Sequence, residues 1–382
     1  MVEIKPFRAV RYKSNDLSKL ICPPYDIISS EQKQQLQKQS KFNWVNIELP
    51  DSYRSANKLL SECLKNKVLI QDKKQSIYLY QQEFCNTFHK TKKTFIRTGF
   101  YCITKIDQDY ILKHEKTSDK PVKDRLNLLK TVKSNVSPIF CLVPDKTKKI
   151  LKQLKSMSVK QKPQICFKVG KEIHRLWVVN DDKLINKLTG ILSNKKILIA
   201  DGHHRFRTSM TYRDIASKNK GFTGMPYDYC LTYICSMSDP GLLILPTHRV
   251  VNLSKELQER VLACFDLSCW DGKSNPELAL YKSGEFKILT LKPKYRQYFK
   301  LPAVTILDKF VLYSVLKENI IYTKDVHDAV RLAGQTDNSA AFLLEPPSME
   351  SIYELSMKNK VMPHKSTYFY PKVPAGVVTY KF

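Results

Sequence analysis

The sequence lacks several features that would assign it to a familiar class. It has no apolar run as long as a membrane span, and its N-terminus, Met-Val-Glu-Ile-Lys-Pro-Phe, lacks the apolar core of a signal peptide. It also contains no Gly-x-x-x-x-Gly-Lys-Ser/Thr motif, which excludes a standard P-loop, and no helix-turn-helix or zinc module. We therefore expect a cytoplasmic protein with no membrane partner.

Cysteine is present but is not arranged for metal binding or disulfides. The 10 cysteines form no Cys-x-x-Cys pair, and no histidine lies near the closest cysteine pairs. In a cytoplasmic protein this pattern favours reduced thiols that pack as small apolar side chains.

Positive charge is abundant, because the chain carries a formal net charge of +28. Lysine supplies most of it and is spread along the chain, whereas base recognition and phosphate clamps favour arginine. A nucleic-acid partner is therefore an open but less favoured interpretation. The length of 382 residues and the hydrophobic content of 42% predict a globular protein of two domains, or of one large α/β unit with an appendage.

Hydrophobic periodicity predicts a mixed α/β (α+β) fold, a mixed sheet with flanking helices. Residues 76–84 and 95–106 alternate like strands. The run 195–200 predicts a buried strand that leads through a turn into a helix over 205–217, and a further helix is predicted at 307–318. We expect an N-terminal α/β region, 1–245, that carries this turn, and a C-terminal α+β region, 246–382, that contributes to the same cleft.

The turn at residues 201–205, Asp-Gly-His-His-Arg, is the strongest candidate site. A helix that starts at such a turn directs free backbone N–H groups at one point, where the helix dipole also favours an anion. Gly202 would let the backbone approach a ligand closely. Arg205 adds a cation whose N–H groups suit phosphate oxygens.

Three side chains of this turn have several candidate roles. His203 and His204 could donate to phosphate oxygens or act as acid or base near neutral pH. Asp201 could orient a histidine, cap the helix or hold Mg²⁺. A transition-metal site is less favoured, because adjacent histidines point in different directions and bind one ion poorly.

Other polar side chains gather at predicted strand ends and helix starts, and we expect them to line the same cleft. They include five of the eight histidines when those of the turn are counted. These candidates are His114, Glu115, Asp124, Arg125, His248, Arg249, His364, Lys365, Ser366 and Thr367. Tyr25 and Asp26 follow Pro23-Pro24 and form either a capped turn or a further carboxylate in the cleft.

Seven stretches together carry a family resemblance. They are KPFRAVRY, CPPYDIIS, HEKT with DRLNLL, ADGHHRFRTS, PTHRVV, AAFLLEPPS and MPHKSTYFYPK. In this order they resemble the hallmark blocks of the domain-of-unknown-function 1015 family, from residue 4 to 382. The sequence departs from the family pattern at Phe206, where the family often has tyrosine. Membership of this family implies no particular reaction.

The Asp-Gly-His-His-Arg turn is also similar to the phosphate-binding turn of the ParB/sulfiredoxin superfamily, which includes free-serine kinases and nucleotide-binding chromosome-partition proteins. The similarity implies a nucleotide-binding core of that type, extended by large β-rich and helical regions. It implies that residues 202–205 hold nucleotide phosphates and that Asp201 lies beside the metal or the acceptor hydroxyl. Those kinases use a glutamate near the N-terminus as base, for which Glu48 and Glu115 are candidates by chemistry alone.

The leading hypothesis is a phosphotransferase that binds ATP or ADP with Mg²⁺ and phosphorylates a small hydroxyl-bearing metabolite. Such a reaction needs charge neutralisation, positioning and a base. His114, Glu115 and the turn residues would handle protons, and the cations would be Arg125, Arg205, Arg249 and Lys365. Two alternatives are a phosphate-ester hydrolase that uses the same cleft and a nucleotide-gated DNA-binding regulator.

Overall fold

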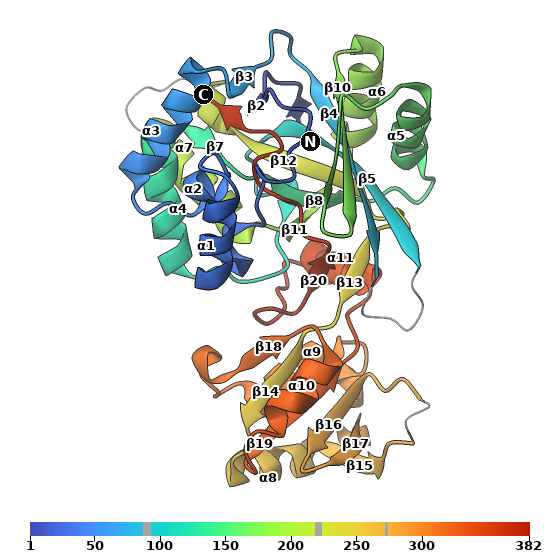
Figure 1. The fold of residues 1–382 in the computed structure, drawn as a ribbon. Coiled ribbons are helices and arrows are strands. Elements are labelled where there is room, and N and C mark those ends of the chain that lie inside the picture. Colours follow the sequence, from blue (N-terminus) through green and yellow to red (C-terminus); the bar gives the residue numbers. More distant parts are fainter. Residues whose placement is uncertain (87–92, 218–223, 272–273) are drawn as a thin grey trace. The chain divides into compact units, whose positions relative to one another are not determined.

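The chain folds into two compact units in the computed structural model, which describes residues 1–86, 93–217, 224–271 and 274–382 (Figure 1). Unit 1 comprises Met1–Lys113, Thr117–Leu242 and Pro371–Phe382. Unit 2 comprises His114–Lys116 and Leu243–Tyr370. No helix in the described ranges is both long and apolar enough to cross a membrane.

Unit 1 is built on a mixed nine-stranded sheet. The strands of this unit are β1 (Ile4–Lys5), β2 (Val10–Tyr12), β3 (Leu69–Gln71), β4 (Ile77–Cys85), β5 (Thr94–Lys105), β6 (Ile111–Leu112), β7 (Ser134–Asn135), β8 (Ile139–Val143), β9 (Ile165–Val169), β10 (Glu172–Val179), β11 (Ile197–Asp201), β12 (Tyr229–Ser236) and β21 (Tyr380–Lys381). The order in the sheet is β6-β11-β8-β12-β5-β4-β10-β9, and β1 pairs with β5. Two pairs, β6 with β11 and β8 with β12, are parallel, and the others are antiparallel.

The two faces of this sheet differ in chemistry, because successive side chains of a strand point to opposite faces. One face is apolar and forms the core with helices α5 and α6. The helices of unit 1 are α1 (Ser30–Gln39), α2 (Val45–Glu48), α3 (Tyr53–Lys65), α4 (Asp119–Val132), α5 (Lys149–Lys160), α6 (Asp182–Ser193) and α7 (His203–Ser217). The strand registers place a second set of side chains on the other face, which we call the polar face: Tyr78, Tyr80, Gln82, Arg97, Tyr101, Phe140, His174, Asp201 and Tyr233.

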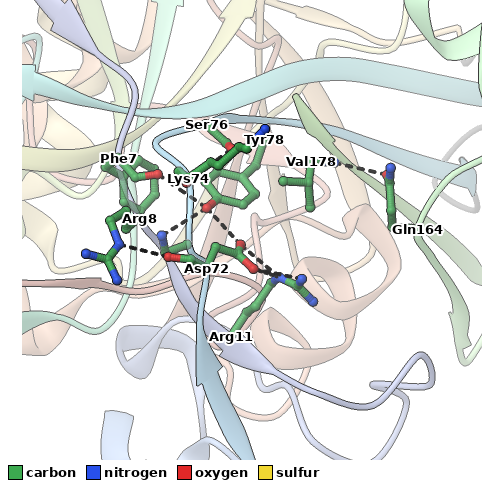
Figure 2. Close-up of polar contacts among 10 residues, drawn as sticks. Phe7, Arg8, Arg11, Asp72, Lys74, Ser76, Tyr78, Gln164 and Val178 are labelled. Carbon is green, nitrogen blue, oxygen red and sulfur yellow. Dashed lines mark hydrogen bonds and ion pairs between the residues drawn. The ribbon is translucent and has the colours of Figure 1, made fainter. Parts of the chain in front are cut away.

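The N-terminal segment is fastened to the polar face through Asp72, which follows β3 (Figure 2). The Asp72 carboxylate accepts hydrogen bonds from Arg11 Nη2 at 2.8 Å and Arg11 Nε at 3.0 Å, and from the Tyr78 hydroxyl at 2.9 Å. The same hydroxyl accepts the Ala9 amide N–H at 2.9 Å. An arginine bound through two nitrogens to one carboxylate fixes both position and orientation, so β2 is held against β4.

Unit 2 is built on an antiparallel six-stranded sheet in the order β15-β17-β16-β19-β14-β18. Its strands are β13 (Leu243–Leu245), β14 (His248–Asn252), β15 (Phe265–Cys269), β16 (Leu278–Lys282), β17 (Glu285–Leu291), β18 (Ile321–Thr323), β19 (Ser339–Leu344) and β20 (Tyr368–Tyr370). Its α-helices are α8 (Lys255–Cys264), α9 (Ala303–Leu307), α10 (Val326–Ala333) and α11 (Met349–Met357). Separate apolar clusters pack α8 and α9 on one face and α10 on the other.

The structure confirms the predicted mixed α/β fold and shows where the sequence-based boundaries differ. The prediction of a helix over 307–318 is wrong, because α9 already ends at Leu307 and a short π-helical turn, Asp308–Leu312, follows. Val311 and Leu312 in that turn are buried, whereas Tyr313 beyond it is 63% exposed, so the chain leaves the core there. The segment Pro371–Phe382, expected in the C-terminal region, packs with unit 1, where β21 pairs with β7.

Replacing Gly99 by alanine tests the close approach of strands on the polar face. A methyl group at Gly99 would lie 2.5 Å from the Ile234 carbonyl oxygen and 2.5 Å from Tyr233 Cζ. We expect the free energy of unfolding, measured by urea titration, to fall by about 1–3 kcal/mol. The control Gly190→Ala adds a methyl with nothing within 4 Å on helix α6, and should raise it by about 0.5–1 kcal/mol. Equal stability of Gly99→Ala and the wild type would contradict this packing.

Candidate functional site

The Asp-Gly-His-His-Arg turn joins the end of β11 to the start of α7 in unit 1, as the sequence predicts. The strand includes Asp201, and the helix begins at His203, two residues before the predicted start. Gly202 has a φ of +95°, a conformation that glycine adopts readily and other residues rarely do. A methyl at Gly202 would lie 3.0 Å from the Arg205 guanidinium carbon, so the Arg205 side chain would have to shift slightly to admit it.

An irregularity in β11 directs Asp201 to the polar face. The register with β8 shifts between Ile199 and Asp201, so that Asp201 lies opposite Phe140. Such a bulge inserts an extra residue and redirects the side chains that follow it. Without the shift, Ala200 would occupy that place and the carboxylate would point toward the apolar core.

The Asp201 carboxylate lies between two cations. Arg205 Nη2 donates to Oδ2 and Lys372 Nζ donates to Oδ1, and all three side chains are at most 12% exposed. Burial alone would raise the pKa of Asp201, but the charges of Lys372 and Arg205 outweigh it and lower the pKa to about 2. The carboxylate is therefore ionised at neutral pH and carries a fixed negative charge.

Arg205 makes a second contact inside the protein, because its Nη1 donates to the Pro138 carbonyl oxygen. Burial works against its charge, but Asp201, Asp26 and Glu48 outweigh burial and raise the pKa of the guanidinium. Arg205 is thus oriented beneath the turn by neighbouring residues. Its predicted role in phosphate binding stays a prediction.

Asp26 brings a second carboxylate to this place. It lies in the short 3₁₀ turn Tyr25–Ile27, and its side chain keeps an exposed surface. Partial desolvation by the surrounding protein and the negative charge of Asp201 raise the pKa of Asp26, although Arg205 and Lys372 act in the opposite direction. The two carboxylates therefore interact electrostatically. This agrees with the alternative in which Asp26 adds a further carboxylate beside the turn.

Glu48 and Arg125 lie on the inner side of the same cluster. Glu48 is fully buried at the end of α2, its Oε1 accepts the Ser137 hydroxyl at 2.9 Å, and burial raises the pKa of its carboxyl despite the nearby guanidinium groups. Arg125 donates to the Glu48 carbonyl oxygen, and its guanidinium carbon lies 4.3 Å from the centre of the Tyr25 ring. These contacts tie α4 to α2 and to the turn that carries Asp26.

Asp124 turns away from this cluster toward α3, where it accepts the Tyr53 hydroxyl at 2.8 Å and pairs with Arg125 at 2.6 Å. A cavity of about 40 Å³ lies between Arg125 and Arg205. Ser137 and Thr208 also line this cavity, which adjoins both α4 and α7.

The two histidines of the turn point to different surroundings. His204 Nε2 accepts the Ser118 backbone N–H at 3.1 Å, so the proton of a neutral His204 is on Nδ1. His203 is 7% exposed, and its charge when protonated helps to lower the pKa of Asp201. Within the described residues, no cluster of three or more His, Cys, Asp or Glu side chains is arranged to hold a metal ion.

The remaining predicted residues form a separate polar cluster in unit 2. His114 Nε2 lies 3.0 Å from the Thr367 hydroxyl, and Glu115 Oε1 accepts the Lys365 backbone N–H at 2.8 Å and lies 2.9 Å from His364 Nδ1. The short segment His114–Lys116 is therefore fastened to the loop that contains residues 363–367. The Ser366 hydroxyl donates to the Pro363 carbonyl in that loop at 2.7 Å.

Two neighbouring residues of β14, His248 and Arg249, are buried in unit 2. Arg249 is buried and donates to the Thr247 carbonyl at 2.6 Å, and burial lowers the pKa of its guanidinium to about 10. His248 Nδ1 accepts the Leu344 backbone N–H at 3.1 Å, and burial lowers the pKa of its imidazole to about 4. The predicted site residues thus fall into two groups, one in each unit, and a shared cleft stays a prediction.

Sequence reasoning missed two cations of unit 1. Lys372 is the last residue of the stretch MPHKSTYFYPK, and its position after Pro371 gives no signal that it meets Asp201. Arg97 occupies a strand, where an arginine predicts an exposed side chain, but it is fully buried on the polar face. Only the tertiary structure reveals either role.

A protein-family model described as a protein of unknown function, DUF1015, matches residues 4–310. The chain belongs to the DUF1015 family. The family resemblance of the stretches up to residue 310 is thereby confirmed. For AAFLLEPPS and MPHKSTYFYPK, which lie beyond the match, it stays a prediction.

Three solved structures are similar to this DUF1015 protein at low TM-scores. SbnI with a C-terminal truncation from Staphylococcus aureus has a TM-score of 0.44 and 8% identity, and the alignment covers 72% of this chain and 85% of SbnI. A conserved hypothetical protein from Pyrococcus furiosus has a TM-score of 0.39 and 14% identity, and the alignment covers 73% of this chain and 94% of that protein. A free serine kinase in complex with AMP has a TM-score of 0.39 and 12% identity, and the alignment covers 72% of this chain and 92% of the kinase chain. No curated protein matches the chain in sequence.

Replacing Asp201 by asparagine tests the two ion pairs. The change leaves Arg205 and Lys372 buried without their common carboxylate, so we expect the free energy of unfolding at pH 7 to fall by about 3–5 kcal/mol. Because the folded pKa of about 2 lies below the ordinary value of 3.8, wild-type Asp201 stabilises the fold above pH 3.8 and loses this effect as the pH falls toward 2. The stability difference between variant and wild type should therefore shrink over that interval.

The matched control is Asp214→Asn, which removes a carboxylate that is 56% exposed and pairs with Arg213. An exposed pair of this kind contributes about 0–1 kcal/mol, so the control should remain close to the wild type. Equal losses in the two variants, measured by urea titration at several pH values, would contradict the structural role of Asp201.

Proposed function

We propose that this DUF1015 protein binds the phosphates of ATP or ADP at the Asp201–Arg205 turn and transfers a phosphoryl group to the hydroxyl of a small metabolite. The observation that supports the proposal most directly is the position of Asp201. It lies at the start of helix α7 with Lys372 and Arg205 on its two oxygens and Asp26 beside it. Carboxylates and cations at a helix start supply the charges that phosphoryl transfer needs.

In this proposal the backbone N–H groups of the first turn of α7 hold a phosphate. Lys372 is the cation that moves, because a lysine is a compact charge on a flexible stem and can pass from Asp201 to a phosphate oxygen. Arg205 stays between Asp201 and the Pro138 carbonyl and keeps the turn in place. His203, buried at the same helix start, provides a further donor when it is protonated.

Asp201 and Asp26 are the residues that would hold Mg²⁺. Mg²⁺ prefers oxygen ligands and is commonly bound by one or two protein carboxylates together with substrate phosphates and water. The negative charges of the two carboxylates repel each other, and a bound cation would relieve that repulsion. When bound, the ion would also neutralise phosphate charge. In the free protein, Lys372 and Arg205 compensate the same negative charge.

We assign Asp26 as the general base. Its pKa is raised from that of an ordinary aspartate, which increases its affinity for a proton, and it keeps the exposed surface that an acceptor hydroxyl must reach. Glu48 has a raised pKa as well but is fully buried. The acceptor oxygen attacks the terminal phosphorus, the bond to the bridging phosphate oxygen breaks, and the acceptor proton passes to Asp26.

Replacing Lys372 by methionine should weaken nucleotide binding. A hydrogen bond to a charged group contributes about 1.5–3 kcal/mol, so we expect the Kd for ADP or ATP with Mg²⁺ to rise roughly 10-fold to 100-fold. Isothermal titration calorimetry measures this change. Lys381→Met, which removes an exposed lysine of the same terminal segment, is the control and should bind as the wild type does. An unchanged Kd for Lys372→Met would contradict the assignment.

A labelled-phosphate assay tests the reaction. Purified protein is incubated with Mg²⁺, with ATP or ADP labelled in the terminal phosphate, and with a pool of small alcohols, and labelled products are separated. We expect a labelled phosphate ester that Asp26→Asn forms about 10²-fold to 10⁴-fold more slowly, since a general base contributes about that factor. Release of inorganic phosphate from phosphate esters without nucleotide would support a hydrolase instead, and no binding at millimolar nucleotide would contradict the proposal.

A further inference from the structure

Arg97 is the most unusual charged group on the polar face of unit 1. Its side chain is fully buried on β5. Nη2 donates to the Gln82 side-chain oxygen, whereas Nε and Nη1 have no hydrogen-bond partner among the described residues. No ion pair of Arg97 occurs in the described part of the chain either.

A buried guanidinium in this state is energetically unfavourable. Burying a charge that is not directly paired costs several kcal/mol, and unmade hydrogen bonds add to that cost. The neighbouring aromatic rings compensate only in part, with the guanidinium carbon 4.8 Å from the centre of the Phe140 ring and 5.9 Å from that of Tyr233. A bound anion would supply both the missing charge and the missing acceptors.

Two observations connect Arg97 with the Asp201 turn. Phe140, beneath the Arg97 guanidinium, is the cross-strand partner of Asp201, so the two side chains share a face. Gln82, which accepts from Arg97, donates through Nε2 to the Lys372 carbonyl oxygen at 3.1 Å, and Lys372 Nζ binds Asp201. Arg97, Lys372 and Arg205 are therefore three cations along one continuous network.

The buried Asp239 carboxylate accepts the Thr98 backbone N–H at 3.0 Å and interacts electrostatically with Arg97, but it accepts no hydrogen bond from the guanidinium in the described part of the chain. The Tyr101 hydroxyl, two residues beyond Gly99 on the same strand, is buried and has no hydrogen-bond partner among the described residues. His174 is hydrogen-bonded to the Tyr80 hydroxyl at 2.7 Å, and burial, aided by the charge of Arg97, lowers the pKa of its imidazole to about 4. His174 is therefore neutral at pH 7 and adds no positive charge.

We propose that Arg97 binds a second phosphate of the ligand whose first phosphate lies at the start of α7, so that the site selects a diphosphate over a monophosphate. The inference rests on the proposed function, because it concerns the same ligand, but it can fail independently. Nε and Nη1 of Arg97 donate to the second phosphate while Nη2 remains on Gln82. Since Arg97 is fully buried, the ligand reaches it only when the side chains that cover it move.

The test compares paired ligands by calorimetry: ADP with AMP, and pyrophosphate with inorganic phosphate. We expect the wild type to bind the diphosphate member of each pair at least 10-fold more tightly. Arg97→Gln should bring the two Kd values of each pair within about 3-fold of each other, mainly by weakening the binding of the diphosphate ligand. The reason is that a charged hydrogen bond contributes about 1.5–3 kcal/mol. Arg97→Lys, which keeps the charge, should retain part of the preference.

The matched control is Arg175→Gln. Arg175 lies on β10 next to His174, points to the opposite side of the sheet, and pairs with Glu83 at 2.8 Å. Its loss should leave the preference for diphosphates unchanged. Circular dichroism and the Tm of each variant establish that the variants fold.

The outcomes separate the two proposals. If the wild type binds ADP and AMP equally, or Arg97→Gln keeps the wild-type preference, the role of Arg97 is overturned while the proposed nucleotide site stands. If the wild type binds neither nucleotide nor pyrophosphate, both proposals are overturned. If the Arg97 variants do not fold, a crystal structure of the wild type with ADP decides: a phosphate oxygen about 3 Å from Nε or Nη1 supports the role, and a water molecule there overturns it.

Discussion

The pairing of one buried carboxylate, Asp201, with two cations is the interaction on which the candidate site depends. A carboxylate buried with a single partner gains little over an apolar core, because desolvation offsets the attraction. Here Lys372 and Arg205 bind different oxygens, and their charges together lower the pKa of Asp201 to about 2. With Asp201 alone the two cations leave one net positive charge, and the nearby Asp26 carboxylate offsets that charge when it is ionised.

The rest of unit 1 supports this arrangement, because the two faces of its main sheet differ in chemistry. The apolar face, covered by α5 and α6, provides the burial that keeps the sheet rigid. The polar face carries tyrosines, a neutral histidine, an arginine and the Asp201 carboxylate, and the shift of register before Asp201 decides on which face the carboxylate lies. Functional groups on rigid strands are held more exactly than groups on loops.

The sequence predicts the local part of this site well. The strand β11, the turn at Gly202 and the helix α7 are predicted from an apolar run, a glycine and a polar helix start. These signals act over only a few residues. The partners from elsewhere in the chain are harder to predict. Nothing near Lys372 or Arg97 indicates their roles, since these arise from strand register and from the return of the chain to unit 1. Likewise, the prediction of one cleft grouped five histidines that the structure divides between two units.

The path of the chain has a consequence for the newly made protein. Asp201 and Lys372 are 171 residues apart, and the long segment Leu243–Tyr370 of unit 2 lies between them. On the ribosome, β11 and α7 emerge with Arg205 as the only one of the two cations yet available to Asp201. The second cation is made only after all of unit 2 has been translated, so the pairing of Asp201 with both cations is completed near the end of synthesis.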